Sequence, residues 1–378
     1  MTSFCPRRVG FFLGLALFVG AASASAAEPI RLGYFMSMTG RDASFGETSI
    51  RGARLAVAEI NAAGGVLGRP LELIVADNRS VAGESATAVK KLITRDKVVA
   101  LIGECVSART LEAAPVAQTA GVPLVTPAST NPRVTEIGNC IFRVCFADPF
   151  QGEVLATFAY RRLGLRRAAL LVDSGAPYSV GLTEAFRRAF TALGGEIVGR
   201  QQYTGGDRDF RAQLTTIRAA RPDFIFLPSY YIEAGLAAKQ ARELGIAFPF
   251  IGGDAYEAPQ FLDISPAALE GTYYCTHFSP ENRDPAAQAF VARFRREFNL
   301  APNGLAALTY DAVRLVADAI ARAGTTERGS LRAALAATRD FPGVTGRTTI
   351  DARRDAAKDA AIMMVHDGRI EFVESVKP

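Results

Sequence analysis

Hydroxyl-bearing residues gather in two short loops in the first third of the chain. One loop contains Ser107, and the other, with the sequence TPASTNP, contains Ala128, Ser129 and Thr130. Ser107 stands where a helix is expected to begin, and the free N–H groups of a helix start attract anions. Ordinary N-capping is the alternative for Ser107 taken alone. The two loops together favour a site for a small anion such as a carboxylate.

An acidic residue occupies a similar position in the second half of the chain. Asp254 follows an apolar segment and two glycines. A ligand with both a carboxylate and an ammonium group needs a partner for its positive charge, because a buried unpaired charge is strongly penalised. Asp254 can be that partner, although an Asp at such a place is also a common turn residue. The two features together predict a zwitterionic, amino-acid-like ligand.

Aromatic and further charged residues occur in loops of the same kind. The aromatic residues are Phe45, Tyr178, Tyr230 and Tyr231. Together they favour a pocket with apolar walls and few polar anchors. Two charged candidates are Arg109 and Glu233. If Arg109 points into the site, it favours an acidic or polar ligand; the alternative is a solvated arginine at a helix start.

These loops follow segments that are expected to be strands. Apolar strands alternate with helices in the first part of the chain, and the same series is repeated after Pro149. This alternation predicts α/β lobes with parallel sheets built from βαβ units. The expected strands are residues 30–36, 71–76, 99–102 and 123–126, followed by residues 168–173, 196–202, 223–227 and 250–251. Such sheets bind ligands at the carboxyl ends of their strands, so two facing sheets place these loops in one cleft.

The length of the chain also indicates two lobes, because a single core rarely grows beyond about 250 to 300 residues. Three late helices are expected at residues 285–298, 306–323 and 330–338. They have no strand series of their own to cover, so we expect the chain to cross between the lobes more than once through a hinge. Two short β-rich segments are expected at residues 348–350 and 361–373.

The expected division into lobes follows from these crossings. Lobe 1 comprises residues 28–148 and about 280–354, and lobe 2 comprises residues 149–279 and about 355–378.

The first 27 residues have the layout of a secretory signal peptide. Arg7 and Arg8 precede an apolar run over residues 9–22, and a small-residue segment follows to Ala27. The run is shorter than the roughly 20 apolar residues that a membrane span needs, which is the alternative. Cys5 lies before the run, where lipidation is not expected. We therefore expect cleavage near Ala27 and a soluble periplasmic protein, by either the general or the twin-arginine export route.

Composition argues against several other classes of function. The chain has 43 basic and 38 acidic residues, which are spread along the sequence, so nucleic acid is not an expected partner. It has two histidines, and neither a metal site nor a cofactor is expected. Nucleotide-binding glycine motifs and a G-x-S-x-G elbow are absent, so an enzyme is not expected.

Four cysteines lie beyond the expected signal peptide. In an oxidising compartment they could form up to two disulfides, with three connectivities that the sequence does not rank. The alternative is that they are small buried apolar residues. The four are Cys105, Cys140, Cys145 and Cys275.

Several strings of sequence resemble one known family. They are GYFMSMTGRDASFGETSIRGARLAVAEINAAGG, RPLELIVADN, TPASTNPRVT, FRVCFADPFQG, LVDSGAPYSVGL, GGDRDF, LPSYYIEAG and FIGGDAYEAP. In this order they are similar to the leucine/isoleucine/valine-binding proteins, the type I periplasmic receptors of branched-chain amino-acid ABC importers. The resemblance covers essentially the whole chain after the signal peptide. It implies two Rossmann-like lobes joined by a multi-strand hinge.

The resemblance also implies a function and a set of site residues. Ser107, Ala128 and Thr130 correspond to the family's ligand-carboxylate and ammonium anchors in the first lobe, and Asp254 corresponds to the acidic anchor in the second. Tyr178 and Tyr230 correspond to aromatic walls. The chain departs from the family pattern in three ways: Phe45 replaces a tyrosine, Asp254 replaces a longer glutamate, and Ser80 replaces a disulfide cysteine.

The expected function is capture of an amino acid, branched-chain by the family's default, or of a related small zwitterion or amide. The expected partner is an inner-membrane ABC permease, and the protein is expected to be a monomer. The alternative is a periplasmic sensor subunit that feeds a signalling receptor.

Overall fold

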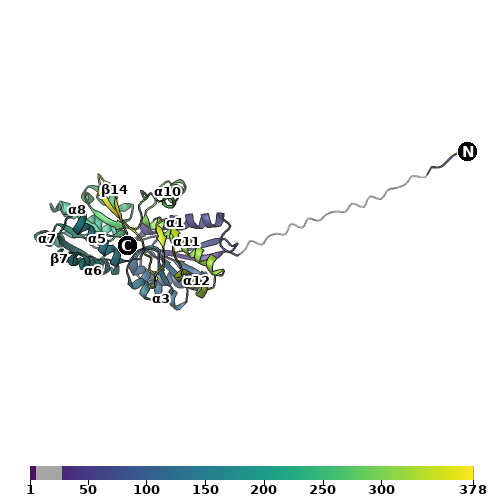
Figure 1. Ribbon diagram of the computed structural model, residues 1–378, viewed down its shortest axis with the longest axis horizontal. Coiled ribbons are helices and arrows are strands. Elements are labelled where there is room, and N and C mark those ends of the chain that lie inside the picture. The colour runs from purple at the N-terminus through teal and green to yellow at the C-terminus, as the bar shows by residue number, and fades with distance from the viewer. Residues whose placement is uncertain (6–27, 378) are drawn as a thin grey trace.

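The computed structural model describes residues 1–5 and 28–377. The expected signal peptide lies mostly outside the described residues. Figure 1 shows two lobes side by side, with α1, α3, α11 and α12 in one lobe and α5 to α8 in the other. Among the described helices, none is long and apolar enough to cross a membrane.

Lobe 1 is built on a parallel sheet of five strands in the order β2-β1-β3-β4-β5. Helices cover both faces, and the short strands β3 and β4 are therefore fully buried and read as continuous apolar runs. The strands are β1 (Ile30–Met36), β2 (Leu71–Asp77), β3 (Ala100–Ile102), β4 (Leu124–Thr126) and β5 (Ile141–Arg143). The helices between them are α1 (Ala43–Ala62), α2 (Glu84–Thr94), α3 (Ser107–Thr119) and α4 (Arg133–Glu136).

Lobe 2 is built on a sheet of seven strands in the order β14-β13-β10-β9-β8-β6-β7. The strands are β6 (Arg167–Asp173), β7 (Glu196–Tyr203), β8 (Phe224–Phe226), β9 (Phe250–Gly252), β10 (Tyr273–Thr276), β13 (Ala360–His366) and β14 (Arg369–Val376). The helices are α5 (Asp148–Thr157), which continues as a π-helix over Phe158–Arg162, α6 (Pro177–Ala192), α7 (Arg211–Ala219), α8 (Tyr231–Glu243) and the short α9 (Gln260–Ile264).

The expected α/β lobes with parallel sheets are confirmed, with an antiparallel edge on the second sheet. β13 pairs antiparallel with β10, and β14 pairs antiparallel with β13. The two edge strands form a hairpin, because Asp367 and Gly368 both have positive φ and turn the chain back at once. The expected single β-rich segment over residues 361–373 is therefore two strands.

Three late helices, α10 (Pro285–Phe298), α11 (Gly304–Ala323) and α12 (Arg328–Ala336), return to lobe 1. α11 packs along α1, and Gly52 makes the close approach possible: a Cβ on this residue would lie 2.0 Å from the backbone oxygen of Ala306. Arg293 of α10 also forms an ion pair with Glu59 of α1 at 2.6 Å. A two-stranded ribbon of β11 (Phe341–Gly343) and β12 (Gly346–Thr348) follows these helices.

The chain passes between the two sheets three times, around residues 144–147, 277–284 and 349–359. Arg143, at the end of β5, forms a 2.6 Å ion pair with Asp355 of the third segment. This pair joins two of the crossing segments. The lobe boundaries assigned from the sequence remain a prediction.

The cysteines form no disulfide in the structure, which therefore has none of the pairings left open above. All four that follow the expected signal peptide are free and buried. Cys105, for example, packs in the core with its Sγ 3.4 Å from the Ser49 hydroxyl. The structure therefore agrees with the alternative, in which the four cysteines are small buried apolar residues.

Candidate ligand-binding site

A cavity with about 290 Å³ of empty space lies between the lobes. Part of this space is open to solvent. Lobe 1 and α11 contribute Phe45, Cys105, Ser107, Ala128 and Leu305, and lobe 2 contributes Tyr178, Tyr230, Asp254 and Ala255. Six of these nine residues are the ones expected from the sequence, and they come from loops that follow strands of both sheets.

The lobe 1 wall is the start of α3 and the loop after β4. Ser107 is the first residue of α3, and its hydroxyl accepts a 3.4 Å hydrogen bond from the Asn131 backbone. The cap residue Val106 makes no side-chain hydrogen bond, and its own N–H donates to Glu104 Oε2 at 2.5 Å. Ser107 lines the cavity, so the N–H groups that begin α3 lie at this wall, where they favour an anionic group.

The buried carboxyl of Glu104 fixes the loop that leads into α3. It accepts hydrogen bonds from the Ser37 hydroxyl at 2.6 Å, the Ser37 backbone at 2.8 Å and the Asn78 amide at 3.1 Å. Burial raises the pKa of Glu104 above its usual value. The sequence analysis did not single out this residue, because its partners are up to 67 residues away.

The lobe 2 wall consists of two tyrosines at helix starts. The Tyr178 and Tyr230 rings lie 5.6 Å apart, and Phe45 of lobe 1 lies 6.1 Å from Tyr230. Gly253 allows Tyr178 to approach, because a Cβ there would lie 2.3 Å from the tyrosine hydroxyl. The Tyr230 hydroxyl is buried and has no hydrogen-bond partner among the described residues.

Asp254 starts a 3-10 turn, separated from β9 by one residue, and lines the cavity from lobe 2. The residue is 5% exposed. Its Oδ1 accepts a 2.9 Å hydrogen bond from the Gln151 amide, and its Oδ2 lies 3.1 Å from His277 Nε2. A carboxylate in this position can pair with a cationic group in the cavity.

Five of the expected site residues do not line the cavity, and two of these five, Ser129 and Thr130, are buried in lobe 1. The Ser129 hydroxyl is 2.6 Å from the Thr110 hydroxyl and donates to the Glu104 carbonyl at 2.8 Å, so it is occupied within lobe 1. Thr130 is buried, and its hydroxyl lies beside the carboxyl of Asp148.

The three remaining candidates lie at the mouth of the cleft or outside it. Arg109 donates to Glu112 at 2.8 Å and to the Ser80 carbonyl at 2.9 Å. Glu233 lies 3.3 Å from the guanidinium of Arg41, which comes from the other lobe.

Tyr231 also bridges the lobes at this mouth. Its hydroxyl donates to the Arg41 carbonyl at 3.0 Å, and its ring meets Phe45 edge-on at 5.4 Å. The two lobes are therefore closed on each other in this structure.

Three cavity residues were missed by the sequence analysis. Cys105 and Ala255 are neighbours of predicted residues, in loops already identified as part of the cleft. Leu305 lies in the first turn of α11, about 50 residues beyond Asp254 in sequence, and only the return of α11 to lobe 1 brings it to the cavity.

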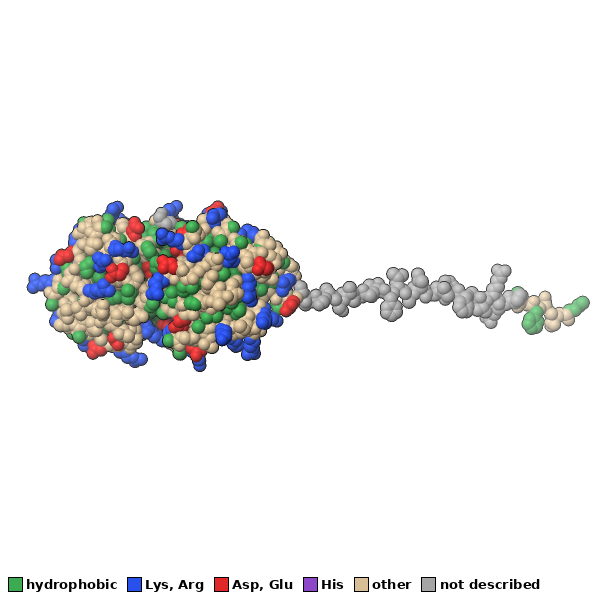
Figure 2. Space-filling model, turned by 90° about the horizontal axis from the view of Figure 1, so that it is seen from below, with side chains coloured by type: hydrophobic (Ala, Val, Ile, Leu, Met, Phe, Trp, Pro, Cys, Tyr) green, Lys and Arg blue, Asp and Glu red, His purple; other side chains and the backbone are tan. Residues whose placement is uncertain are grey.

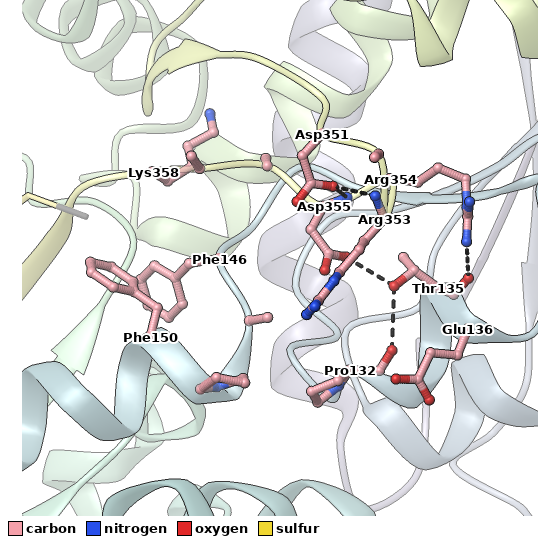
Figure 3. A pocket seen from close by; sticks show the side chains of 15 residues that line it. Pro132, Thr135, Glu136, Phe146, Phe150, Asp351, Arg353, Arg354, Asp355 and Lys358 are labelled. Atoms are coloured by element: carbon pink, nitrogen blue, oxygen red, sulfur yellow. Dashed lines mark hydrogen bonds between the residues drawn. The ribbon is translucent and has the colours of Figure 1, made fainter. Parts of the chain in front are cut away.

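A larger hollow, with about 1380 Å³ of empty space, lies at the hinge (Figure 3). Its walls carry Phe146 and Phe150 on one side and residues 351–358 on the other. Two of its charged groups bond Thr135 of the wall: Asp355 accepts from the Thr135 hydroxyl at 2.9 Å, and Arg354 donates to the Thr135 carbonyl at 2.7 Å. None of the site residues expected from the sequence is among its lining residues. The smaller cavity is therefore the candidate site.

Charge on the outer surface is mixed. In Figure 2 the Lys and Arg side chains are scattered over both lobes and alternate with acidic ones. The visible face has no continuous basic area of the kind that tracks a nucleic-acid backbone.

Asp148 predicts a pH dependence of stability. Burial raises the pKa of its carboxyl to about 8, although the Thr130 hydroxyl and the Arg143 charge act to lower it. The folded protein therefore holds a proton that the unfolded chain releases near pH 3.8. Stability from this group is full below that pH and is lost as the pH rises toward 8.

Asp148→Asn should therefore remove a negative slope of roughly 1.4 kcal/mol per pH unit in the free energy of unfolding between pH 5 and 7.5. Urea unfolding at a series of pH values measures this slope. The control is Asp367→Asn, at a surface carboxyl whose side chain is 87% exposed. Parallel pH profiles for wild type and Asp148→Asn would contradict the assignment.

The chain is similar to a known family of proteins. Residues 29–369 match the sequence model of a family described as periplasmic binding protein. An amino acid binding protein of Pseudomonas aeruginosa is 32% identical over 292 residues, which covers 76% of this chain and 77% of the relative.

Two solved structures are similar over nearly their whole length. The leucine binding protein LivK from Thermotoga maritima has 38% identity and a TM-score of 0.89, and the match covers 92% of this chain and 99% of that one. The branched-chain amino acid transporter substrate binding protein LivJ from Streptococcus pneumoniae, in complex with isoleucine, has 35% identity and a TM-score of 0.88. That match covers 93% of this chain and 100% of LivJ.

The sequence match and the fold match point to the same family. The family is described as one of periplasmic binding proteins, which are solute-binding proteins of transporters rather than enzymes. The chain belongs to the periplasmic binding protein family, within the group of leucine/isoleucine/valine-binding proteins.

Proposed function

We propose that this chain captures an aliphatic amino acid, branched-chain in the first instance, in the periplasm and delivers it to an ABC permease in the inner membrane. One observation carries the proposal: the same cavity is lined by Ser107, the first residue of α3 in lobe 1, and by Asp254 of lobe 2. These are complementary partners for the two charges of an amino acid.

In this proposal the ligand carboxylate lies against Ser107 and the backbone of the Ala128 loop, with Thr130 supporting that loop. The ammonium group pairs with Asp254. The aliphatic side chain packs among Phe45, Cys105 and Leu305, which line the same cavity.

The position of Arg109 supports an aliphatic ligand over an acidic one. Both ends of its guanidinium are engaged by Glu112 and the Ser80 carbonyl, and the residue does not line the cavity. An acidic side chain would then have no cation to pair with among the cavity residues, and its burial would be penalised.

Binding is proposed to proceed by hinge closure. The ligand first contacts lobe 1, and lobe 2 then brings Tyr230 and Asp254 onto it. The contacts of Arg41 with Glu233 and with the Tyr231 hydroxyl join the lobes across the mouth of the cleft and belong to the closed state. Ligand shifts the equilibrium toward closure only through contacts that the open state lacks.

Export is proposed to depend on the segment up to Ala27, whose basic start, apolar run and small-residue end are typical of a cleaved signal peptide. The mature chain would then meet its ligand in the periplasm, where its relatives act.

A thermal-shift screen of the mature protein tests the ligand class. The panel contains branched-chain, small, acidic and aromatic amino acids together with amides, urea and aromatic acids. Leucine, isoleucine or valine at 100 times its Kd should stabilise the fold by about 2.7 kcal/mol. Stabilisation by aromatic acids or amides alone would contradict the proposal.

Uptake measurements test delivery to a permease. Deleting the gene for this protein should lower uptake of the radiolabelled ligand identified in the screen. Unchanged uptake would favour the alternative role as a sensor subunit.

A further inference from the structure

The Asp254 carboxylate is held by two side chains that do not line the cavity themselves. Gln151 of α5 donates to Oδ1 at 2.9 Å, and His277, just after β10, lies 3.1 Å from Oδ2. Gln151 and His277 are 0% and 4% exposed. The carboxylate is therefore fixed from two elements that lie 103 and 23 residues away in sequence.

The geometry of the His277 ring determines where its proton lies. Nε2 faces the Asp254 oxygen, and an unprotonated Nε2 would direct its lone pair at a carboxylate. Nδ1 is buried and has no hydrogen-bond partner among the described residues, so a second N–H would be buried without an acceptor. The contact with Asp254 is satisfied when Nε2 carries a proton and donates to the carboxylate.

The orientation of the ring is fixed by packing. Phe146 stacks against His277 with ring centroids 3.7 Å apart and an interplanar angle of 32°. Phe146 belongs to the first segment that crosses between the lobes, and His277 belongs to the second. The His277 ring, in one hinge segment, is therefore held behind the cavity wall by Phe146 of another.

The neighbouring carboxyl does not add a second negative charge. Asp148 is buried, and its pKa is raised to about 8, so it is neutral at pH 7. The acidic group of this wall that lines the cavity is therefore Asp254, with Gln151 and His277 behind it. A carboxylate accepts several hydrogen bonds, so two donors behind it leave lone pairs for a cation in the cavity.

We propose that His277 and Gln151 are positioning residues, which hold the Asp254 carboxylate directed at the cavity and so set the preference for ligands with an ammonium group. This inference rests on the proposed function, since it assumes that the ligand carries an amine. A purely structural role for the two residues would affect all ligands equally.

The test compares leucine with its des-amino analogue, 4-methylpentanoate, by isothermal titration calorimetry of the full mature chain. His277→Leu removes the donor at similar volume. It should weaken leucine binding by about 10- to 100-fold, the range of a charge-assisted hydrogen bond. It should change 4-methylpentanoate binding less than threefold. Gln151→Leu should act in the same direction.

A conservative variant and a matched control complete the test. His277→Gln presents an amide N–H in place of Nε2 and should restore most of the preference for leucine. His366→Leu removes an exposed imidazole, which pairs with Glu270 on the surface, and should leave both affinities unchanged.

The outcomes separate this inference from the proposal on which it rests. A wild-type ratio of the two affinities in His277→Leu, or a loss in His277→Gln as large as in His277→Leu, would overturn the positioning role alone. A wild-type protein that binds leucine no better than 4-methylpentanoate would overturn the amino-acid function, and this inference with it.

Discussion

Replacing Asp254 by alanine is expected to weaken leucine binding by about 100-fold or more. Truncating one partner of a buried, hydrogen-bonded charge pair costs about 2 to 5 kcal/mol, because the other charge is left buried without a partner. In this protein the unpaired charge would be the ligand ammonium. The Asp254 side chain is buried at the cavity wall, so little water is available to replace it.

Binding of 4-methylpentanoate should change far less, because this ligand has no ammonium to lose its partner. Calorimetric titration of both ligands against wild type and Asp254→Ala measures the difference. Asp254→Asn, which keeps the shape of the side chain but not the charge, should show most of the same loss.

Glu233→Ala is the control for a general effect of removing a negative charge. Glu233 pairs with Arg41 at the mouth of the cleft and does not line the cavity. Its loss should affect the two ligands to a similar extent. Equal losses for the two ligands in Asp254→Ala would remove Asp254 from the ammonium role.

Replacing Arg143 by methionine is expected to lower the free energy of unfolding by about 3 to 5 kcal/mol. Arg143 is fully buried, and its guanidinium pairs with Asp355 at 2.6 Å. It also donates to the carbonyls of Ser129 and Asn131 at 2.7 and 2.9 Å. Removing it leaves a partly buried carboxylate and two carbonyls without their partner, which is the costly way to break a buried ion pair.

Urea unfolding of the two variants and the wild type measures this effect. The control is Arg347→Met, which breaks the exposed pair with Asp340 and should cost less than about 1 kcal/mol. Because Arg143 holds the loop that contains Ala128, the variant should also bind ligand more weakly. A denaturation midpoint for Arg143→Met equal to that of Arg347→Met would contradict the prediction.

Sequence periodicity was a good guide to the strands and helices of both lobes. Strand β1, for example, has the bounds expected from its apolar run. Because parallel strands end at the same edge of a sheet, loops such as those containing Ser107, Tyr178 and Asp254 could be assigned to one cleft before any coordinates. The structure places these three residues on one cavity.

The sequence did not predict very short strands, because a few residues show no periodicity. It also did not predict the direction of pairing between strands that are distant in sequence. β5 and β10 are only three and four residues long and were missed. The antiparallel edge of lobe 2 depends on β13 meeting β10 some 90 residues earlier, which no local pattern records.

The sequence by itself determined the two α/β lobes, the family, and the loops that carry hydroxyl, aromatic and acidic groups, because these follow from local periodicity and from motifs. Tertiary structure alone decided that Arg109 and Ser129 are occupied elsewhere, that Leu305 reaches the cavity, and that the cysteines stay free. It alone placed His277 and Gln151 behind Asp254. The physical reason is that a side chain's partner is set by distance in space, and here the partners come from different elements that only the closed, three-segment hinge brings together.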